Sequence, residues 1–202
     1  MSTDANKRTQ AERTEATRAS LIAAARELFT GHGYASVATE QIVKRAGVTR
    51  GALYHHFDDK RDLLRAVYEQ IEAELALRLG EAVSPGAGSL ETLAAGAELF
   101  LDACLEPEVQ RIALHDAPAV LGWEEWREIG ARYGLGLIEA LLSTGMDAGE
   151  IRLQPLTPLS HALLGALDEV AMLVARADDP VVARAEAGET LAGLVEALRP
   201  PR

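Results

Sequence analysis

The sequence predicts an all-α protein with an N-terminal unit of three helices and a larger helical body. Alanine, leucine and glutamate dominate its 202 residues, and all three favour helices. Alternating apolar and polar residues, which are typical of half-buried strands, are missing. Glycines and prolines divide the chain into stretches whose apolar residues recur at helical spacing, so we expect helices joined by turns.

The first expected helix ends at the segment from Gly31 to Gly33. Thr9 and Glu12 have the spacing of a capping box near its start. Residues 1 to about 10 are polar and are expected to form a flexible arm. The apolar residues that recur on one face of the helix are Leu21, Ile22, Ala25, Leu28 and Phe29.

Two short helices follow, with a tight turn between them. We expect the second helix over about 39–46, and Gly47 follows it where a glycine with positive φ commonly ends a helix. Thr49 is in position to cap the third helix, over roughly 50–57. A helix, a glycine-centred turn and a second helix make up the helix-turn-helix layout.

The third helix has two unlike faces. At about 100° per residue, Leu53 and Phe57 fall together and face inward. The residues on the other side are Arg50, Gly51, Ala52, Tyr54 and His55. This combination suits neither a core nor a plain solvated surface. A glycine costs a helix about 1 kcal/mol relative to alanine. At a helix start, however, it lets the free N–H groups and the positive dipole lie close to nucleic-acid phosphates.

A longer fourth helix is expected from Lys60 to about Leu79, capped by Asp58 and Asp59. The segment 84–88, which reads SPGAG, breaks the chain, and an unusual loop is expected within 111–123. The remaining helices are expected near 89–105, 107–115, 123–144, 157–177 and 180–198.

Charge divides the chain into two domains, 1–68 and 69–202. The first carries 11 basic and 8 acidic residues, a net of +3, whereas the second carries 9 basic and 23 acidic residues, a net of −14. An acidic body repels a polyanion, so any nucleic acid is expected to contact the N-terminal domain alone.

Neither a metal site nor a catalytic site is expected, and no cofactor. Cys104 is the only cysteine, and the phosphate-binding and nucleophile motifs of common enzymes are missing. The N-terminus lacks an apolar leader, and no apolar run approaches the ~18 residues of a membrane span, so a cytoplasmic protein is expected. The histidines, none with metal-binding spacing, are His32, His55, His56, His115 and His161.

Residues 46–57, AGVTRGALYHHF, stand in a longer pattern with Gly33-Tyr34, Ile42-Val43, Lys60 and Leu63. In residue type, order and spacing, this pattern resembles the TetR family of transcriptional repressors. The resemblance implies that the three N-terminal helices bind the major groove of double-stranded operator DNA. It also implies that the fourth helix connects them to a ligand-binding domain.

The resemblance assigns DNA contacts to positions of this chain. It implies phosphate contacts for Tyr54, His56 and Lys60 and a contact with the DNA backbone for Thr39. For Tyr54 the alternative is packing against the first helix, and for His56 it is a structural hydrogen bond. The residues that it implies in the groove are Thr49, Arg50, Gly51, Ala52 and His55.

The chain departs from the family at the start of the second helix. The family usually has a serine or threonine there, where this chain has Val37 and Ala38. We expect Ser36 or Thr39 to take over the capping role; otherwise the helix start loses about 1 kcal/mol.

The last two expected helices are candidates for pairing between two copies of the chain. Segments 161–175 and 181–198 are rich in alanine and glycine and more apolar than helices that bury one side. The corresponding helices of TetR-like proteins form a dimeric four-helix bundle, so a homodimer is expected. The alternative is that both segments are buried within the monomer.

An aromatic stripe is the candidate effector site. Trp123, Trp126 and Tyr133 recur at helical spacing, and His115 and Asp116 could orient a polar ligand. Core packing and helix capping are the alternatives. The expected effector is a small molecule that is apolar, aromatic or cationic.

These observations favour a ligand-responsive repressor that binds a palindromic operator as a homodimer. The alternative is a helical ligand-binding or protein-interaction module whose helix-turn-helix does not bind DNA.

Overall fold

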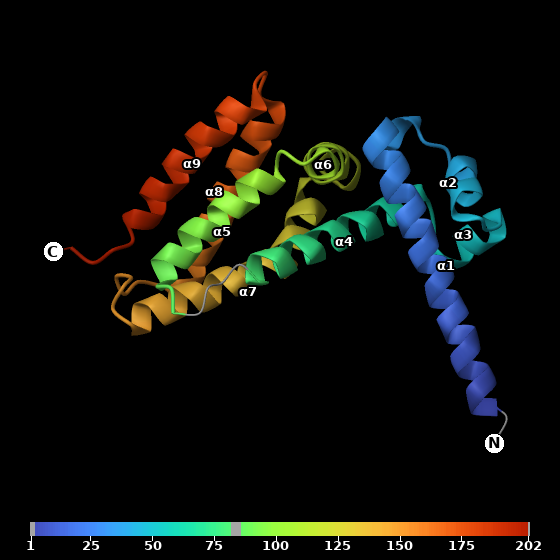
Figure 1. Ribbon diagram of the computed structural model, residues 1–202, viewed down its shortest axis with the longest axis horizontal. Helices are drawn as coiled ribbons and strands as arrows, with labels where there is room; N and C mark the ends of the chain where they lie inside the picture. The colour runs from blue at the N-terminus through green and yellow to red at the C-terminus, as the bar shows by residue number, and fades with distance from the viewer. Residues whose placement is uncertain (1–2, 82–85, 202) are drawn as a thin grey trace.

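The computed structural model describes residues 3–81 and 86–201, and every regular element in these two ranges is a helix. Figure 1 shows α1 to α3 at one end of the molecule, the body at the other, and the long helix α4 running between them. The elements are α1 (Thr3–His32), η1 (Tyr34–Ser36), α2 (Thr39–Ala46), α3 (Arg50–His56), α4 (Lys60–Glu81), α5 (Ser89–Ala103), η2 (Val109–Asp116), α6 (Ala117–Leu121), α7 (Trp123–Asp147), α8 (Leu156–Arg176) and α9 (Pro180–Glu196).

The N-terminal helices pack around a small apolar core. Leu21 and Phe29 of α1, Ile42 of α2 and Leu53 of α3 have no accessible surface. Gly47 ends α2 with a φ of 69°, in the left-handed region that favours glycine, so the expected turn is confirmed. The inner face of α3 is therefore the one that the helical spacing predicts.

The first helix begins earlier than the capping box predicts. Residues 3–10 continue α1 and do not form an arm separate from it. Several of these residues, among them alanine, lysine and arginine, are good helix formers, which favours the longer helix.

The start of α2 also differs from the expectation. Ala38 is the residue before the helix, and its N–H donates to the Oε1 of Gln41 at 2.7 Å. Neither Ser36 nor Thr39 caps α2 with its side chain. The capping prediction was wrong because Gln41 reaches back from within the first turn.

α4 connects the two ends of the molecule without a break. Its start is capped as expected, because Asp59 Oδ1 accepts the N–H of Asp62 at 2.7 Å. Leu64 and Val67, one turn further, are fully buried in an apolar cluster that includes residues of both α1 and the body. α4 therefore packs against both the helix-turn-helix and the body.

The body consists of paired helices. α5 packs against α9, α7 packs against α8, and α4 lies along α7. The helix expected near 107–115 continues through Leu121, where an unusual loop was expected within 111–123, since the π-helix η2 leads directly into α6. Pro118 does not interrupt α6, because it stands in the first turn of the helix, where no N–H bond is lost. Of the expected break at 84–88, residues 82–85 lie outside the described ranges.

α8 is long and apolar enough, by length and composition alone, to cross a membrane. In the structure it packs against α7 and α9. Asp168 in its middle forms an ion pair with Arg127 of α7 at 2.7 Å. These contacts are those of a helix in the body of a globular domain.

Candidate nucleic-acid interface and interior cavity

The outer face of α3 is open to solvent. Arg50 is 64% exposed, and its guanidinium lies 5.5 Å from the ring centroid of Tyr54 and 3.1 Å from the Glu40 carboxylate. The hydrogen bond and charge of Tyr54, followed by the charge of Glu40, raise the pKa of Arg50, which stays a cation. Exposed pairs of this kind are weak, so Arg50 is available to an external acceptor.

Gly51 is not required by the packing of the protein itself. A Cβ at this position would meet only Thr49 Oγ1 within 4 Å, at 3.9 Å, and its φ lies outside the positive range. The fold would thus accept alanine, which favours the helix. The glycine leaves room for an external surface instead.

The neighbours of Gly51 are exposed or half-buried. Thr49 caps α3, since its Oγ1 accepts the Ala52 N–H at 3.2 Å, and its own hydroxyl proton is left for another acceptor. Tyr54 is 45% exposed, His55 is exposed, and His56 lies at the rim of the core. The phosphate contacts implied for Tyr54 and His56 remain predictions.

Lys60 has an internal role that the sequence did not indicate. Its ammonium donates to the carbonyl oxygens of Tyr34 and Val37, both at 2.9 Å, and lies 4.0 Å from the ring centroid of Tyr34. Burial lowers the pKa of Lys60, and the carboxylate of Asp116 opposes this shift. Two of its three N–H donors are used within the protein, so a phosphate contact would rest on the third.

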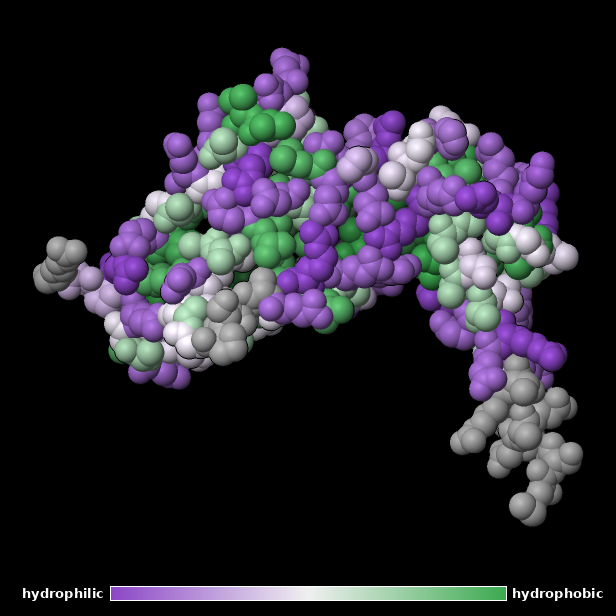
Figure 2. All heavy atoms as spheres, viewed as in Figure 1, coloured by the Kyte–Doolittle hydropathy of each residue, from purple (hydrophilic) through white to green (hydrophobic). Residues whose placement is uncertain are grey.

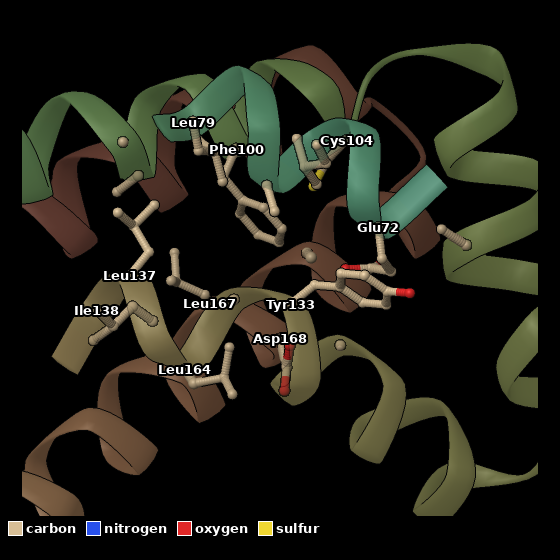
Figure 3. A pocket seen from close by; sticks show the side chains of 18 of the residues that line it. Glu72, Leu79, Phe100, Cys104, Tyr133, Leu137, Ile138, Leu164, Leu167 and Asp168 are labelled. Carbon is tan, nitrogen blue, oxygen red and sulfur yellow. The ribbon is translucent and has the colours of Figure 1, made fainter. Parts of the chain in front are cut away.

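A cavity of about 120 Å³ lies in the body between α4, α5, η2, α7 and α8. Its walls are mainly leucine, alanine and aromatic side chains. Figure 3 shows Glu72, Tyr133 and Asp168 at one end of the cavity, and Leu79, Leu137 and Ile138 toward the other. The cavity therefore has a polar end and an apolar end.

Two carboxyl groups define the polar end. Burial raises the pKa of Glu72 to about 7; a hydrogen bond from Tyr68 opposes this, and the charge of Asp168 adds to it. Burial also raises the pKa of Asp168, to about 6, against the opposing charge of Arg127. Near neutral pH, a fraction of the Glu72 side chains is protonated.

Polar contacts join the body to the helix-turn-helix. Asp116 at the end of η2 is buried, and its Oδ2 accepts the Tyr34 N–H at 2.7 Å. Arg26 of α1 binds Glu108 and Glu74, at 2.6 and 2.7 Å. The Lys60 ammonium and the Asp116 carboxylate thus hold the same short segment between α1 and α2 from two sides.

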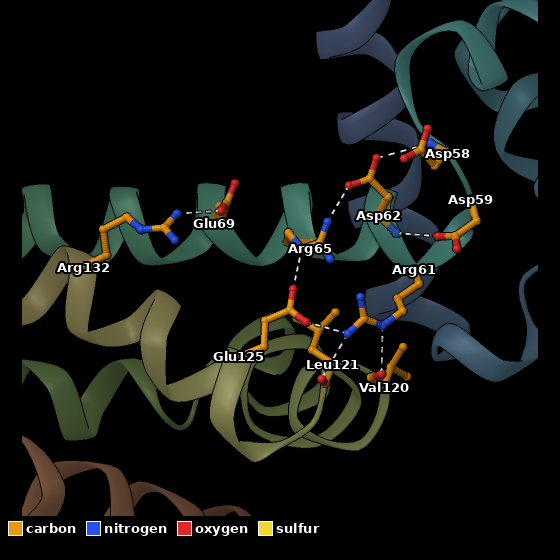
Figure 4. A network of polar contacts seen from close by, with 10 residues as sticks. All are labelled: Asp58, Asp59, Arg61, Asp62, Arg65, Glu69, Val120, Leu121, Glu125 and Arg132. Atoms are coloured by element: carbon orange, nitrogen blue, oxygen red, sulfur yellow. Dashed lines mark hydrogen bonds and ion pairs between the residues drawn. The ribbon is translucent and has the colours of Figure 1, made fainter.

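A second set of contacts joins α4 to α6 and α7 (Figure 4). Arg61 donates to the Leu121 carbonyl oxygen at 3.1 Å and to Glu125 at 2.5 Å. Arg65 also pairs with Glu125. These two arginines lower the pKa of Glu125 in spite of its burial, so the carboxylate stays charged. The first turns of α4 are fixed to the body by ionic contacts.

Comparison with known proteins places both ends of the chain in one family. Residues 21–67 match the bacterial regulatory proteins of the tetR family, and residues 90–198 match a Tetracyclin repressor-like C-terminal domain. The TetC protein of transposon Tn10 from Escherichia coli is 30% identical over 171 residues, which cover 83% of this chain and 84% of that protein. The chain belongs to the TetR family.

Solved structures agree with this assignment. A TetR-family transcriptional regulator from Pectobacterium atrosepticum is 34% identical, with a TM-score of 0.84 over 95% of this chain and 98% of that one. RolR, crystallised with resorcinol, has the same fold at 22% identity and a TM-score of 0.72, over 95% of this chain and 98% of its own. This TetR-family chain is a transcriptional regulator with a helix-turn-helix DNA-binding domain and a ligand-binding C-terminal domain.

The structure divides the five residues proposed for the effector site. Trp126 and Tyr133 line the cavity, and Trp126 Nε1 donates to the Ala113 carbonyl oxygen at 2.8 Å. Trp123 is 50% exposed and borders a separate polar depression on the surface. Position 123 begins α7 at the molecular surface, three residues before the stripe turns inward, and the effector role of Trp123 stays a prediction.

His115 and Asp116 do not line the cavity either. His115 is exposed, and Asp116 is turned toward Tyr34 of the TetR-type helix-turn-helix. The π-helical winding of η2 places Ala113 and Leu114 on the cavity wall and the two polar residues beyond it. Asp116 thus contacts the segment between α1 and α2, and His115 contacts Asp116.

Sequence reasoning missed the polar residues of the cavity. Glu72 and Asp168 each lie in the middle of a long helix, and an acidic residue is rarely buried unless it is paired. Arg127, the partner of Asp168, follows Trp126 directly. An acidic residue inside an apolar stretch of α8 was the available signal.

Part of the surface of the last two helices is apolar. Figure 2 shows hydrophobic atoms gathered where α8 meets α9. Within the described residues, Leu173 of α8 and Val181, Val182 and Leu194 of α9 are 46 to 66% exposed in the single chain. Other faces of the same helices are buried, with Val174 and Leu191 in the main core.

Proposed function

We propose that this regulator is a repressor that binds a palindromic operator as a homodimer and releases it when a small molecule fills the cavity. One observation carries the proposal. α4 bonds the helix-turn-helix through Lys60 at its first turn and lines the cavity with Tyr68, Glu72 and Leu79 further on. A ligand that displaces α4 changes the separation of the two recognition helices, which DNA fixes at about 34–36 Å.

The contact surfaces of the proposal follow from exposure and charge. Residues on the outer face of α3 are assigned to the major groove, with Arg50 as the base-reading side chain, since arginine and guanine make the commonest specific contact. The remaining assigned contacts are Thr39, Thr49, Gly51, Ala52, Tyr54, His55, His56 and Lys60. The exposed apolar residues of α8 and α9 are assigned to the partner copy. We place the protein in the cytoplasm, where its DNA would be.

The effector is proposed to be small and largely aromatic or apolar. The cavity walls support this, and RolR shows that one protein of this fold binds an aromatic diol. The domains of the proposal are 1–68 for DNA and 69–202 for the effector and the partner copy.

The test is a gel shift with the DNA upstream of the protein's own gene, with and without a ligand found by thermal-shift screening. Footprinting should show two half-sites one helical turn apart, and the ligand should weaken DNA binding. Linkage requires that operator DNA weaken ligand binding by the same factor, typically about 5–150-fold. Equal ligand affinity for free and DNA-bound protein would contradict the proposed release.

A further inference from the structure

We propose that the polar end of the cavity binds the hydroxyl group of a small neutral phenol, which donates a hydrogen bond to the carboxyl group of Glu72. The ring would lie in the apolar part, beside Phe100 and the leucines of α7 and α8. This inference rests on the proposed function, because it names the chemical class of effector for the same cavity.

The size of the cavity limits the ligand to about one ring. Its volume is about 120 Å³. For comparison, an engineered protein cavity of about 150 Å³, lined by apolar side chains, binds benzene. Phe100 of α5 and Trp126 and Tyr133 of α7 supply aromatic side chains around this space. A flat six-membered ring with one or two small substituents fits these dimensions.

Glu72 is the group that the protein itself leaves incompletely bonded. Among the described residues it has no ion-pair partner, whereas Asp168, at the same end, pairs with Arg127 at 2.7 Å. The hydroxyl of Tyr68 bonds Glu72, and it also lies 3.3 Å from the Trp126 carbonyl oxygen, to which it can donate instead. A carboxyl group in an apolar cavity therefore has acceptor capacity for a donor that the protein does not supply.

The charges around Glu72 select a neutral donor. The groups that face it are Tyr68 on α4, Cys104 after α5, Arg127 and Tyr133 on α7, and Asp168 on α8. The carboxyl groups of Glu72 and Asp168 outnumber the single guanidinium of Arg127, so this end of the cavity repels an anion such as benzoate. A cation would have to lose its hydration in a mainly apolar cavity, and burial already disfavours charge at Glu72. A phenol supplies the donor without that penalty.

The experiment compares phenol with toluene, in which a methyl group replaces the hydroxyl, using the full-length protein without DNA. Benzylamine and benzoate serve as the cationic and anionic probes, and affinities are measured by calorimetry or ligand-detected NMR at pH 8. Phenol is expected to bind at least about tenfold more tightly than toluene, because a site with an unpaired acceptor rejects the analogue that lacks the donor. Both charged probes are expected to bind more weakly than phenol.

Two variants identify the residue responsible. Glu72→Met removes the acceptor at nearly constant volume and should abolish the preference for phenol while toluene still binds. Gly130→Ala adds a methyl group 3.6 Å from the Tyr68 hydroxyl and 4.0 Å from Glu72 Oε2, without a clash, and should weaken phenol more than toluene because it stands beside the proposed acceptor. Glu91→Gln, at an exposed position of α5, is the charge control and should change neither affinity.

The outcomes separate this inference from the proposed function. An unchanged preference for phenol in Glu72→Met overturns the assignment of Glu72. Tighter binding of benzylamine or of benzoate overturns the neutral class, and the absence of binding by all four probes overturns the subsite. A gel shift is run in parallel. If the protein binds DNA although one of these three outcomes is found, the DNA-binding part of the proposed function is unaffected. Phenol binding without DNA binding contradicts the proposed function alone.

Discussion

The outer face of α3 and the polar end of the cavity both keep polar groups that the protein hardly uses. On α3, Arg50 is solvated and its pair with Glu40 is exposed, so holding it there does not oppose folding. In the cavity, Glu72 is half-buried among apolar side chains, and burial raises its pKa to about 7. A side chain that destabilises the folded protein is a stronger indication of a ligand than an exposed one that leaves stability unchanged. The cavity is therefore the better structural argument for function, although the helix-turn-helix is the easier one to recognise.

Replacing Glu72 measures that cost. A carboxyl group whose pKa is about 7 in the folded state and about 4.5 in the unfolded state binds more protons when folded, so stability falls as pH rises from about 4.5 to 7. Glu72→Gln removes this loss. We expect the free energy of unfolding at pH 8 to rise by up to about 3 kcal/mol, since one pKa unit corresponds to about 1.4 kcal/mol.

Urea unfolding at pH 5 and pH 8 provides the measurement. At pH 5 the same variant should gain less than about 1 kcal/mol. Asp168 has the same sign of shift, so some pH dependence remains in the variant. An equal gain at both pH values would show that packing, and not ionisation, distinguishes Glu72 from glutamine.

Replacing Arg50 tests the other region. Arg50→Ala is expected to weaken binding to the cognate site by roughly ten- to hundred-fold and to affect random DNA less. Arg45→Ala is the control: Arg45 is also exposed, pairs with Glu27, and lies on α2, so it removes the same charge from elsewhere on the domain. Its effect should be smaller and similar on both DNAs. If Arg50→Ala weakened binding to cognate and random DNA by the same factor, Arg50 would contact a phosphate and not a base.

Asp116 allows a test of how the two regions are joined. Asp116→Ala leaves the Tyr34 N–H without its acceptor, which should destabilise the protein by about 1–3 kcal/mol. Asp116→Asn keeps an acceptor oxygen and should cost less. If the contact transmits the signal, Asp116→Ala should also reduce the factor by which an effector weakens DNA binding. The factor is obtained from calorimetric titration of free and DNA-bound protein. An unchanged factor would leave α4 and the Arg26–Glu108 ion pair as the connections between the two regions.

The two regions also differ in how far the sequence predicts them. The helix-turn-helix was predicted closely because its signals are local: Gly47, Thr49 and the spacing of Leu53 all lie within one short stretch and act on their own turn or helix. Lys60 was predicted as a phosphate contact alone. Its internal bonds were missed because the carbonyl groups that accept them, those of Tyr34 and Val37, depend on how the turn before α2 folds back.

In the body, helix positions could be predicted but the cavity only in part. Trp126 and Tyr133 share one helix, so their spacing brings them together on one face. Glu72 and Asp168 come from α4 and α8, and only tertiary packing places them at the same end of the cavity. Asp116 was assigned to the effector site because it is a polar residue near the aromatic stripe in the sequence. The direction of its side chain depends on the π-helical winding of η2, which the sequence did not indicate.

Gly51→Ala is the smallest expected change and separates folding from DNA binding most cleanly. The new methyl group would lie 3.9 Å from Thr49 Oγ1 and near nothing else, so α3 should gain about 0.5–1 kcal/mol of stability from the better helix former. Gly31→Ala is the matched control, because Gly31 is an exposed helical glycine of the same domain with no atom within 4 Å of its Cβ position. Both variants should raise the unfolding midpoint, but only Gly51→Ala should weaken operator binding in a gel shift, since only there does the methyl group stand between the helix backbone and the DNA. Full operator binding by Gly51→Ala would mean that α3 keeps its distance from the DNA, and the assignment of Gly51 to the groove would then be wrong.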